Sequence, residues 1–420
     1  MGNNLNISIF GLGYVGLPLA VMLSKYFNVL GYDKNIQRIK DLKSFLDKNN
    51  EVSYKDLKKT KLKYSTDIKD LKNSDIFIVT VPTPVTRTNK PDLKPVLESC
   101  KDIGKIIKKN SIVVFESTVY PGVTEEICGP EIEKYSKLVS GKDFYLGYSP
   151  ERMNPGDKLH TVDKIIKVIS GDCRKTVLTL KRIYGKINSN KIFIAKDIKT
   201  AEAAKVIENT QRDINVAFIN EITKLFKKID INIFDVLKAA QTKWNFLNFK
   251  PGFVGGHCIG VDPYYLAYLA KRKNISPSLI LSGRKVNNNF PIFLADFINS
   301  KISRKNKILI LGLTFKENVS DLRNTKVIEL IKSLKKKGHK VYVNDTYADL
   351  NEVKKLSLKI TPLNKKENYD TIILAVAHDD YKKLKYSFFS KKLKKNGKIF
   401  DLKAIWINKK LPKKIEYKTI

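Results

Sequence analysis

A short run of β-forming residues leads directly into a glycine-rich turn near the start of the chain, and this junction constrains the fold most. Residues 7–10 are Ile-Ser-Ile-Phe, the motif GLGYVG follows, and an apolar helical stretch leads to a second strand that ends at Asp33. This order is typical of a βαβ unit that binds a dinucleotide. We therefore expect a parallel sheet with helices on both faces.

The residues of this motif have separate physical tasks. Gly11 makes the tight turn, Gly13 lets the backbone approach a pyrophosphate, and Gly16 lets the helix pack against the strand. Asp33 can accept both ribose hydroxyls and would repel a 2′-phosphate, so NAD is favoured over NADP; an FAD site remains possible in principle. The motif's predicted cofactor contacts are Gly11, Gly13, Tyr14, Val15, Gly16 and Asp33.

Strand and helix patterns alternate in both halves of the chain. Residues 200 to about 229 carry apolar side chains at spacings of three, four or seven, which predicts a long helix and a candidate dimer interface. The predicted fold class is α/β, with two Rossmann-like doubly wound parallel-sheet domains joined by this central helix, and the expected segments are 1–198, 199–300 and 301–420. The predicted strands are residues 6–12, 29–33, 75–81, 111–116, 144–149, 308–313, 340–344, 371–376 and 398–401.

The formal charge of +37 raises nucleic acid as a partner, because a basic surface neutralises phosphates. Only 10 of the 79 basic residues are arginines, however, and the lysines are scattered along the chain. Compositional bias explains this better, so we predict no nucleic-acid partner. Residues 1–24 are uncharged but lack the basic start of a signal peptide, and no other uncharged run has spanning length. We expect a cytoplasmic protein without a membrane partner.

Four separated cysteines without a CxxC pair indicate free thiols in a reducing compartment and no metal site. Cys258 differs from the others because it lies in the glycine-rich loop 252–262, where glycines allow a ligand to lie against the backbone. His257 precedes it. Adjacent residues in an extended loop tend to point apart, so we interpret His257 as a loop or substrate contact and not as half of a Cys-His pair.

Several separated motifs resemble those of the UDP-glucose/GDP-mannose dehydrogenase family along nearly the full length of the chain. They are GLGYVG, VPTP at 81–84, ESTVYPG at 116–122, SPER at 149–152, AEAAKVIENTQRD from Ala201, GGHC at 255–258, and FKENVSDLRNT from Phe315. The resemblance implies that Cys258 traps a C6 aldehyde. A first oxidation converts the alcohol to an aldehyde, thiol addition gives a thiohemiacetal, a second oxidation gives a thioester, and water releases a uronic acid.

Lys205 and Asn209 lie four residues apart and so share a helix face, which by spacing alone could equally be solvated. The resemblance makes Lys205 the proton acceptor for the C6 hydroxyl and, with Asn209, a stabiliser of alkoxide and oxyanion. It assigns Asp262 to the hydrolysis step. The full predicted catalytic set is Cys258, Lys205, Asn209, Asp262, Thr118 and Glu151.

Binding roles follow from the same resemblance. The C-terminal segment is expected to bind uridine diphosphate, since its strand ending at Gly312 lacks the full fingerprint but leads to Lys316. Further predicted cofactor contacts are Arg38, Thr83, Thr118 and Arg323. The predicted substrate contacts are Glu151, Arg152, Lys205, Asn209, Arg212, Gly255, His257 and Lys316.

The identity of the sugar depends on two departures from the UDP-glucose pattern. His257 and Val261 stand where that pattern commonly has serine and lysine, and GGHCIGVDPYYL resembles the branch acting on UDP-N-acetylhexosamines for capsule, O-antigen or Vi-type polysaccharides. We predict UDP-GlcNAc as substrate, UDP-GalNAc next, and UDP-ManNAc or UDP-glucose as alternatives. A non-catalytic nucleotide-sugar-binding protein is the alternative from another class. A homodimer or larger homo-oligomer is expected.

Overall fold

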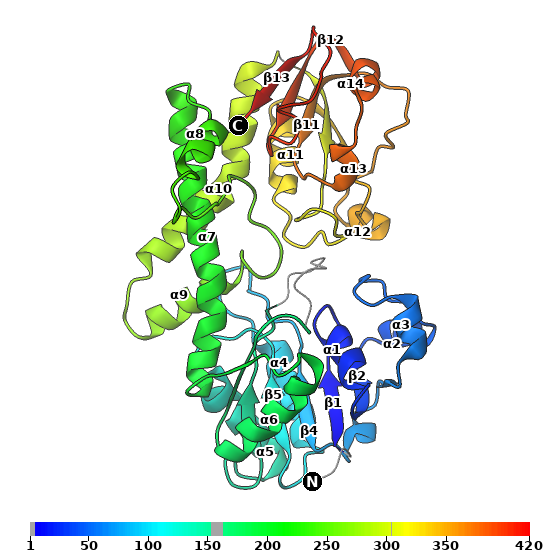
Figure 1. Ribbon diagram of the computed structural model, residues 1–420, viewed down its shortest axis with the longest axis vertical. Helices are drawn as coiled ribbons and strands as arrows, with labels where there is room; N and C mark the ends of the chain where they lie inside the picture. Colours follow the sequence, from blue (N-terminus) through cyan, green and yellow to red (C-terminus); the bar gives the residue numbers. More distant parts are fainter. Residues whose placement is uncertain (1–4, 153–162, 304) are drawn as a thin grey trace. The chain divides into compact units, whose positions relative to one another are not determined.

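The computed structural model describes residues 5–152, 163–303 and 305–420 and divides the chain into two compact units (Figure 1). The first unit contains the chain up to Glu208 together with Tyr264–Ser276. The second contains Asn209–Pro263 and Pro277–Ile420. Each unit has its own sheet, which is mostly parallel in the first unit and fully parallel in the second.

The first unit is built on an 8-stranded sheet in the order β3-β2-β1-β4-β5-β6-β7-β8. All neighbouring pairs are parallel except β6 and β7, which run antiparallel. The two βαβ halves therefore diverge from β1 and β4, as in a dinucleotide-binding fold. The strands are β1 (Asn6–Phe10), β2 (Asn28–Tyr32), β3 (Lys63–Ser65), β4 (Ile76–Val79), β5 (Ile112–Phe115), β6 (Tyr145–Tyr148), β7 (Lys167–Gly171) and β8 (Ile192–Ile194).

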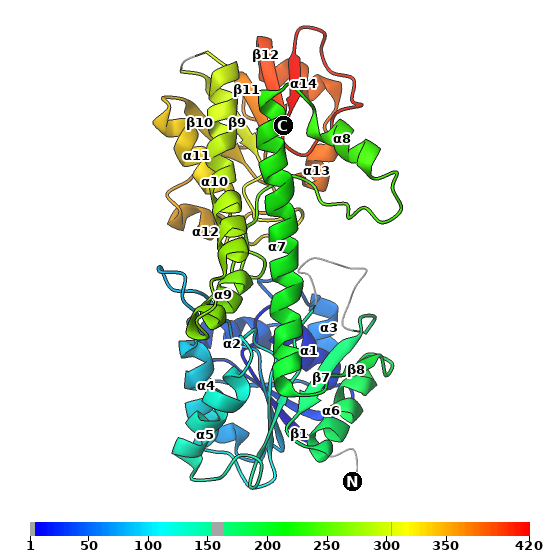
Figure 2. The same cartoon turned by 90° about the vertical axis from the view of Figure 1, so that its left-hand side faces the viewer.

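Helices cover both faces of this sheet (Figure 2). On one face, Ile7 and Ile9 of β1 pack in a buried cluster with Leu17 of α1 and Leu180 of α6. On the other face α4 and α5 pack together. The helices are α1 (Gly16–Leu23), α2 (Ile36–Lys43), α3 (Tyr54–Lys59), α4 (Lys94–Gly104), α5 (Gly129–Ser136) and α6 (Arg174–Ile187), with a 3-10 turn η1 (Ile68–Leu71) and a π-helical turn η2 (Thr124–Cys128).

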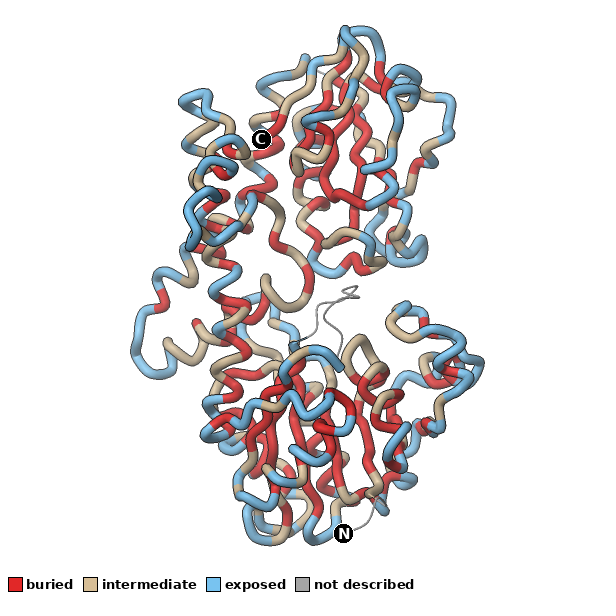
Figure 3. Tube along the Cα trace, viewed as in Figure 1, coloured by how far each residue is buried: buried red, intermediate tan, exposed pale blue. Residues whose placement is uncertain are grey.

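The second unit carries a 5-stranded sheet in the order β10-β9-β11-β12-β13, with every neighbouring pair parallel. Alternate residues of β9 face opposite layers: Ile308 and Ile310 pack with α10 and α11, whereas Leu309 and Leu311 pack with α14. Figure 3 shows the buried residues concentrated along these strands. The strands are β9 (Lys307–Leu311), β10 (Lys340–Asn344), β11 (Tyr369–Leu374), β12 (Leu393–Asp401) and β13 (Glu416–Thr419).

A long helix, α7 (Ile198–Lys228), follows the first sheet, close to the range that the apolar spacing predicted. The expected α/β fold class with two parallel-sheet domains and a long helix is thereby confirmed. The sequence patterns missed the strands β3, β7, β8 and β13. Of these, β3, β8 and β13 are edge strands of three or four residues with few buried positions, so they lack the longer apolar run of a central strand. The remaining helices are α8 (Ile233–Ala240), α9 (Asp262–Arg272), α10 (Ser278–Lys301), α11 (Val327–Lys336), α12 (Leu350–Lys355), α13 (Asp379–Lys382) and α14 (Tyr386–Lys392).

The two sheets repeat one local arrangement at their first strands. Gly11 and Gly312 follow β1 and β9 with φ of +90° and +93°, a region that glycine adopts without steric cost. The next backbone N–H donates to the acid that follows the second strand. This bond joins Leu12 N to Asp33 Oδ2 at 2.9 Å, and Leu313 N to Asp345 Oδ2 at 2.5 Å. The alternation of strands and helices that the sequence shows in both halves is therefore accompanied by the same hydrogen bond after the first strand.

No helix in the part of the chain that the structure describes is long and apolar enough to cross a membrane.

Gly16 permits the close approach of α1 to β1, and its replacement is the first testable prediction. A Cβ there would lie 1.9 Å from the carbonyl oxygen of Gly11 and 2.3 Å from Thr80 Oγ1. We expect Gly16→Ala to lower the free energy of unfolding by roughly 3 kcal/mol or more, measured by urea denaturation. Gly13→Ala is the matched control, because an added Cβ there meets nothing within 4 Å. Equal stability of the two variants would contradict this packing role.

Candidate active site

The turn after β1 is shaped to receive a phosphate group. Thr80 Oγ1 donates to the carbonyl oxygen of Gly11 at 2.7 Å. This hydrogen bond gives the Gly11 carbonyl a partner within the tight turn. The helix α1 begins directly afterwards, and its N-cap residue Val15 makes no side-chain cap hydrogen bond. The open space at Gly13 and the helix N-terminus together suit the approach of a pyrophosphate.

Asp33 and Arg38 frame the same turn. Besides holding Leu12 N, Asp33 accepts the N–H of Asn35 at 2.8 Å through Oδ1, and its side chain remains partly exposed. The guanidinium of Arg38 donates to the Leu12 carbonyl and to Asp47, both at 2.8 Å, and its buried Nη2 has no hydrogen-bond partner among the described residues. A carboxylate, an unsatisfied cationic donor and an open glycine fit the ribose and phosphates of a dinucleotide. Tyr14 and Thr83 are also half-buried.

Thr118 follows the carboxyl end of β5 and is half-buried. The loop just beyond it is fixed by Glu202 of α7, whose carboxylate accepts the N–H groups of Gly122 at 2.6 Å and Thr124 at 2.9 Å. Burial raises the pKa of Glu202 to about 7, although these two donors oppose the rise. This glutamate lies in the AEAAKVIENTQRD motif, and its role in fixing the loop was not predicted from the motif.

Glu151 is buried in an ionic network that sequence reasoning did not foresee. The ammonium of Lys167 lies 3.2 Å from Glu151 Oε2 and 2.7 Å from Glu116 Oε2, and Tyr184 donates to Glu116 Oε1 at 2.5 Å. Burial raises the pKa of Glu116. Burial opposes the charge of Lys167, but the two carboxylates outweigh it and raise the pKa of that ammonium. The network fixes Glu151 directly after β6.

Arg152, the next residue, extends toward solvent and pairs with Glu208 of α7 at 2.8 Å. Its backbone N–H donates to Glu151 Oε1 at 2.6 Å. Lys205 lies on α7 one turn before Asn209 and is buried, as is Asn209. The solvated helix face that spacing alone allowed is therefore excluded, whereas Arg212 of the same helix is exposed.

In the second unit, the loop around Cys258 is a series of turns that lead into α9. The Cys258 carbonyl accepts the N–H groups of Val261 and Asp262, both at 2.9 Å. The Asp262 carboxylate accepts the amide of Asn209 at 2.5 Å, and both side chains are buried. Two predicted catalytic residues are thus brought together, at the start of the helix that the cysteine precedes.

One expectation about this loop is wrong. His257 and Cys258 were expected to point apart, but His257 Nδ1 lies 3.2 Å from Cys258 Sγ. The physical reason is that residues 256–261 form turns, so the alternation of an extended backbone does not apply. The two side chains therefore form the Cys-His pair that the sequence analysis set aside.

The glycines before Cys258 are required for packing against the segment 315–325. A Cβ on Gly255 would lie 2.8 Å from the Asn324 carbonyl oxygen, and one on Gly256 would lie 2.8 Å from the ring of Phe315. Asn324 also donates to the Gly256 carbonyl at 3.1 Å. Two motifs that are far apart in the sequence are therefore adjacent, and these glycines serve protein contacts rather than only a ligand.

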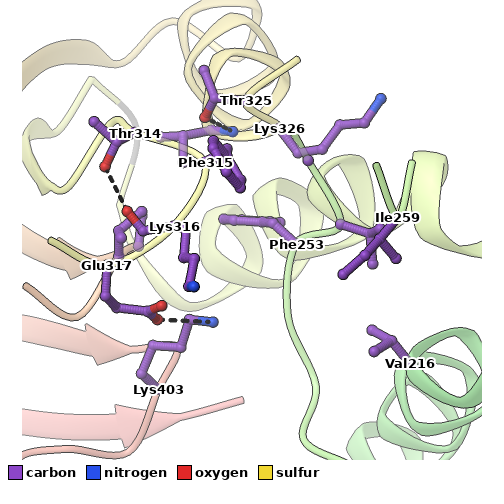
Figure 4. Close-up of a pocket in the computed structure, with 15 residues that line it drawn as sticks. Val216, Phe253, Ile259, Thr314, Phe315, Lys316, Glu317, Thr325, Lys326 and Lys403 are labelled. Carbon is purple, nitrogen blue, oxygen red and sulfur yellow. Dashed lines mark hydrogen bonds and ion pairs between the residues drawn. The ribbon is translucent and has the colours of Figure 1, made fainter. Parts of the chain in front are cut away.

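Beside this contact lies a cavity of about 230 Å³, smaller than typical cavities for whole ligands and sized for part of one. In Figure 4, Phe253 and Ile259 approach from one side, and Lys316, Glu317 and Lys403 from the other. Burial would raise the pKa of Glu317, but the charge of Lys403 and a backbone N–H outweigh it and lower that pKa. The lining residues are Val216, Phe253, Val254, Gly255, Ile259, Thr314, Phe315, Lys316, Glu317, Thr325, Lys326, Val327, Ala375, Val376 and Lys403.

The cavity is cationic overall, which suits a phosphorylated ligand. Burial and the neighbouring charge of Arg284 lower the pKa of Lys326. Of these lysines only Lys316 was predicted from the sequence. Lys403 follows β12, at the edge of a parallel sheet where ligands commonly bind. Arg323 instead binds Asp321 through Nε and Nη2, at 3.0 and 2.6 Å.

Family models match the chain in three consecutive segments. The NAD binding domain of the UDP-glucose/GDP-mannose dehydrogenase family matches residues 5–188, its central domain residues 199–289, and its UDP binding domain residues 309–408. The chain belongs to the UDP-glucose/GDP-mannose dehydrogenase family and is an NAD-dependent nucleotide-sugar dehydrogenase. The family and the NAD cofactor expected from the motifs are thereby confirmed.

Individual relatives cover almost the whole chain. Protein CapL of Staphylococcus aureus is 48% identical over 409 residues, covering 96% of each chain. The UDP-N-acetyl-D-glucosamine 6-dehydrogenase of Salmonella typhi is 43% identical over 391 residues, covering 91% of this chain and 92% of its own. The structure of the UDP-D-ManNAc dehydrogenase of Pyrococcus horikoshii aligns over 99% of both chains with a TM-score of 0.88 and 28% identity.

Glu202 makes a pH-dependent contribution that can be measured. Its folded-state pKa of about 7 lies above the ordinary 4.5, so between these pH values the folded state binds more protons than the unfolded state. The stability contributed by this group is fully present below pH 4.5 and is lost as pH rises through 7, by about 3 kcal/mol. We expect Glu202→Gln to flatten the dependence of the unfolding free energy on pH between 5 and 8. Glu98→Gln, on an exposed side chain, is the control; an unchanged slope in Glu202→Gln would refute the assignment.

Proposed function

We propose that this enzyme oxidises C6 of UDP-N-acetylglucosamine twice, to the uronic acid, through a covalent intermediate on Cys258. The observation that carries the proposal is the arrangement in the second unit. Cys258 precedes α9, the buried Asn209–Asp262 pair lies at the start of that helix, and the lysine-lined cavity borders the same loop. The product suits the synthesis of acidic capsule-type polysaccharides, the role implied by the motifs.

In this mechanism the protein's own groups hold substrate and move protons. NAD, held at the turn after β1, would supply the hydride acceptor for each oxidation. Lys205 takes the proton of the C6 hydroxyl and then, charged, stabilises the oxyanion together with Asn209. Cys258 forms the carbon–sulfur bond, and Asp262 orients the water that hydrolyses the thioester. Thr118 positions a water or the reacting end of the cofactor, and Glu151, fixed by Lys167, assists hydrolysis.

Binding is divided between the two sheets. We assign the cofactor to the turn after β1, with Gly11, Gly13, Gly16, Asp33 and Arg38, and also to Arg323. We assign the uridine diphosphate to the cavity lined by Lys316, where Lys326 and Lys403 add positive charge. Arg152, Arg212, Gly255 and His257 remain predicted substrate contacts.

The choice of sugar rests on the sequence around Cys258 and on the relatives. Val261 is buried at the position where the UDP-glucose pattern has lysine, and the Salmonella relative, named for UDP-N-acetyl-D-glucosamine, shares 43% identity. UDP-GalNAc ranks next. UDP-ManNAc is the third candidate because the Pyrococcus neighbour is named for it, at a lower identity of 28%.

The proposal predicts the outcome of an NADH-release screen over UDP-GlcNAc, UDP-GalNAc, UDP-ManNAc and UDP-glucose. UDP-GlcNAc should give the highest kcat/KM, with two NADH formed per uronic acid, measured by absorbance and by mass spectrometry of the product. Because one hydroxyl contact decides between epimers, we expect discrimination of roughly tenfold or more. Cys258→Ser should lose the second oxidation, whereas Cys173→Ser should retain both.

A Cys258→Ser protein that completes the second oxidation at the wild-type rate would exclude the covalent role. Absence of NADH from all four sugars would favour a non-catalytic nucleotide-sugar-binding protein. A highest kcat/KM with another of these UDP-sugars would support the reaction but show that the proposed substrate, UDP-GlcNAc, is wrong.

The same helix that carries Lys205 suggests the assembly state, and we propose a homodimer through the opposite face of α7. Ile207, Phe218 and Leu225 follow one stripe at helical spacing and are 54%, 58% and 53% exposed. Half-exposed large apolar side chains in one stripe are typical of a helix that pairs with an identical partner.

Replacing Phe218 and Leu225 together by glutamate should dissociate this dimer, because the new charges would lie in an apolar interface. Sedimentation velocity would measure the change, and an unchanged helical circular dichroism spectrum would serve as the folding control. A double variant that sediments like the wild type would contradict the interface.

A further inference from the structure

Cys258 shares its turn with an imidazole that contacts its sulfur. The Nδ1 atom of His257 lies 3.2 Å from Sγ, within hydrogen-bonding distance for a thiol. The contact is fixed from both ends, because the Cys258 carbonyl accepts two N–H groups at the start of α9 and the backbone of Gly256 bonds to residues of the segment 315–325. The pair is therefore set by turns and packing.

The carboxylate of Asp321 lies near the other nitrogen of the His257 imidazole. Asp321 Oδ2 lies 3.8 Å from His257 Nε2, at the opposite end of the ring from the sulfur. Its side chain is only 3% exposed, and the Arg323 guanidinium and backbone N–H hold both of its oxygens. At 3.8 Å the carboxylate is too far for a hydrogen bond to the ring, but its buried negative charge attracts an imidazole that has taken up a proton.

The reaction proposed for Cys258 requires a group near the thiol that can accept its proton. The UDP-glucose pattern has a lysine three residues after the cysteine, but here that residue is the buried Val261. The loop thus lacks that cation. It has instead a histidine, His257, whose Nδ1 contacts the Cys258 sulfur. A thiol that must attack and later leave benefits from a group that takes its proton and returns it.

We propose that His257 is a catalytic residue that accepts the proton of Cys258 during attack and returns it when the thioester is hydrolysed, with Asp321 as its positioning residue. This inference rests on the proposed function. During attack the S–H bond breaks, the carbon–sulfur bond forms, Nδ1 takes the proton, and the aldehyde oxygen gains the electron pair. During hydrolysis the carbon–sulfur bond breaks, water supplies a hydroxyl group and releases a proton to solvent, and sulfur regains the proton of Nδ1.

The charged groups of the second unit that face this loop come from several elements. Asp321 and Arg323 lie on the segment that packs against it, and Asp262 begins α9 and is bonded to Asn209 of α7. Arg284 of α10 approaches Gly260, and Lys316 lines the adjoining cavity. The imidazole lies within hydrogen-bonding distance of the sulfur, at 3.2 Å, so its proton exchange should change the reactivity of the thiol.

The test measures alkylation of Cys258 by iodoacetamide between pH 6 and 9.5 in the full-length protein, with each cysteine followed by peptide mass spectrometry. In His257→Asn, which keeps a polar group near the Nδ1 position but cannot take a proton, alkylation at pH 7 should slow roughly tenfold and the pH profile should move upward. Asp321→Asn should show a smaller change in the same direction. Cys173, which is partly exposed and contacts Thr176, is the internal control. At each pH it should react at the same rate in the variants as in the wild type.

A second measurement separates proton transfer from a structural role. His257→Ala should lose activity with UDP-GlcNAc and recover part of kcat when free imidazole is added, which a purely structural defect would not do. Wild-type alkylation rates and pH profile in His257→Asn would overturn the inference. The proposed function fails separately, through absence of NADH from every UDP-sugar, and the alkylation profile can still be measured in that case.

Discussion

Parallel pairing of the strands dictates where this enzyme can carry out chemistry. Because neighbouring strands run in the same direction, their carboxyl ends meet along one edge of each sheet, and the loops that leave this edge carry several of the predicted site residues. In the first unit these loops carry Gly13, Asp33, Thr118 and Glu151 after β1, β2, β5 and β6. In the second unit the same rule places Lys316 after β9 and the unforeseen Lys403 after β12.

Buried ion pairs are a second feature that the two units share. Lys167 lies between Glu116 and Glu151, and in the second unit Arg284 donates to the buried Asp213 at 2.5 Å. Such pairs add little net stability, because desolvation offsets their attraction, but removal of one partner leaves an uncompensated charge. These pairs fix the orientation of each carboxylate. The pair with Lys167 thereby holds Glu151 in place just after β6.

The loop of Cys258 shows how a local rule can mislead. Extended neighbours point apart, so His257 and Cys258 were expected to diverge, but hydrogen bonds from the start of α9 to the Cys258 carbonyl fold the loop into turns. The glycines before them accommodate Phe315 and Asn324, some sixty residues later in the chain. Neither contact can be read from spacing, because both depend on which distant segment packs against the loop.

The sequence by itself determined the parallel-sheet class, the long helix, the dinucleotide turn and the family, since each depends on a short-range pattern of glycines, acids and apolar spacing. It also identified Asn209 and Asp262, but not that they are bonded to one another. Only the tertiary structure decided the pairing of His257 with Cys258, the position of Asp321 behind it, and the network around Lys167. These contacts join residues whose separation in the chain carries no periodic signal, and the packing of whole elements sets their distances.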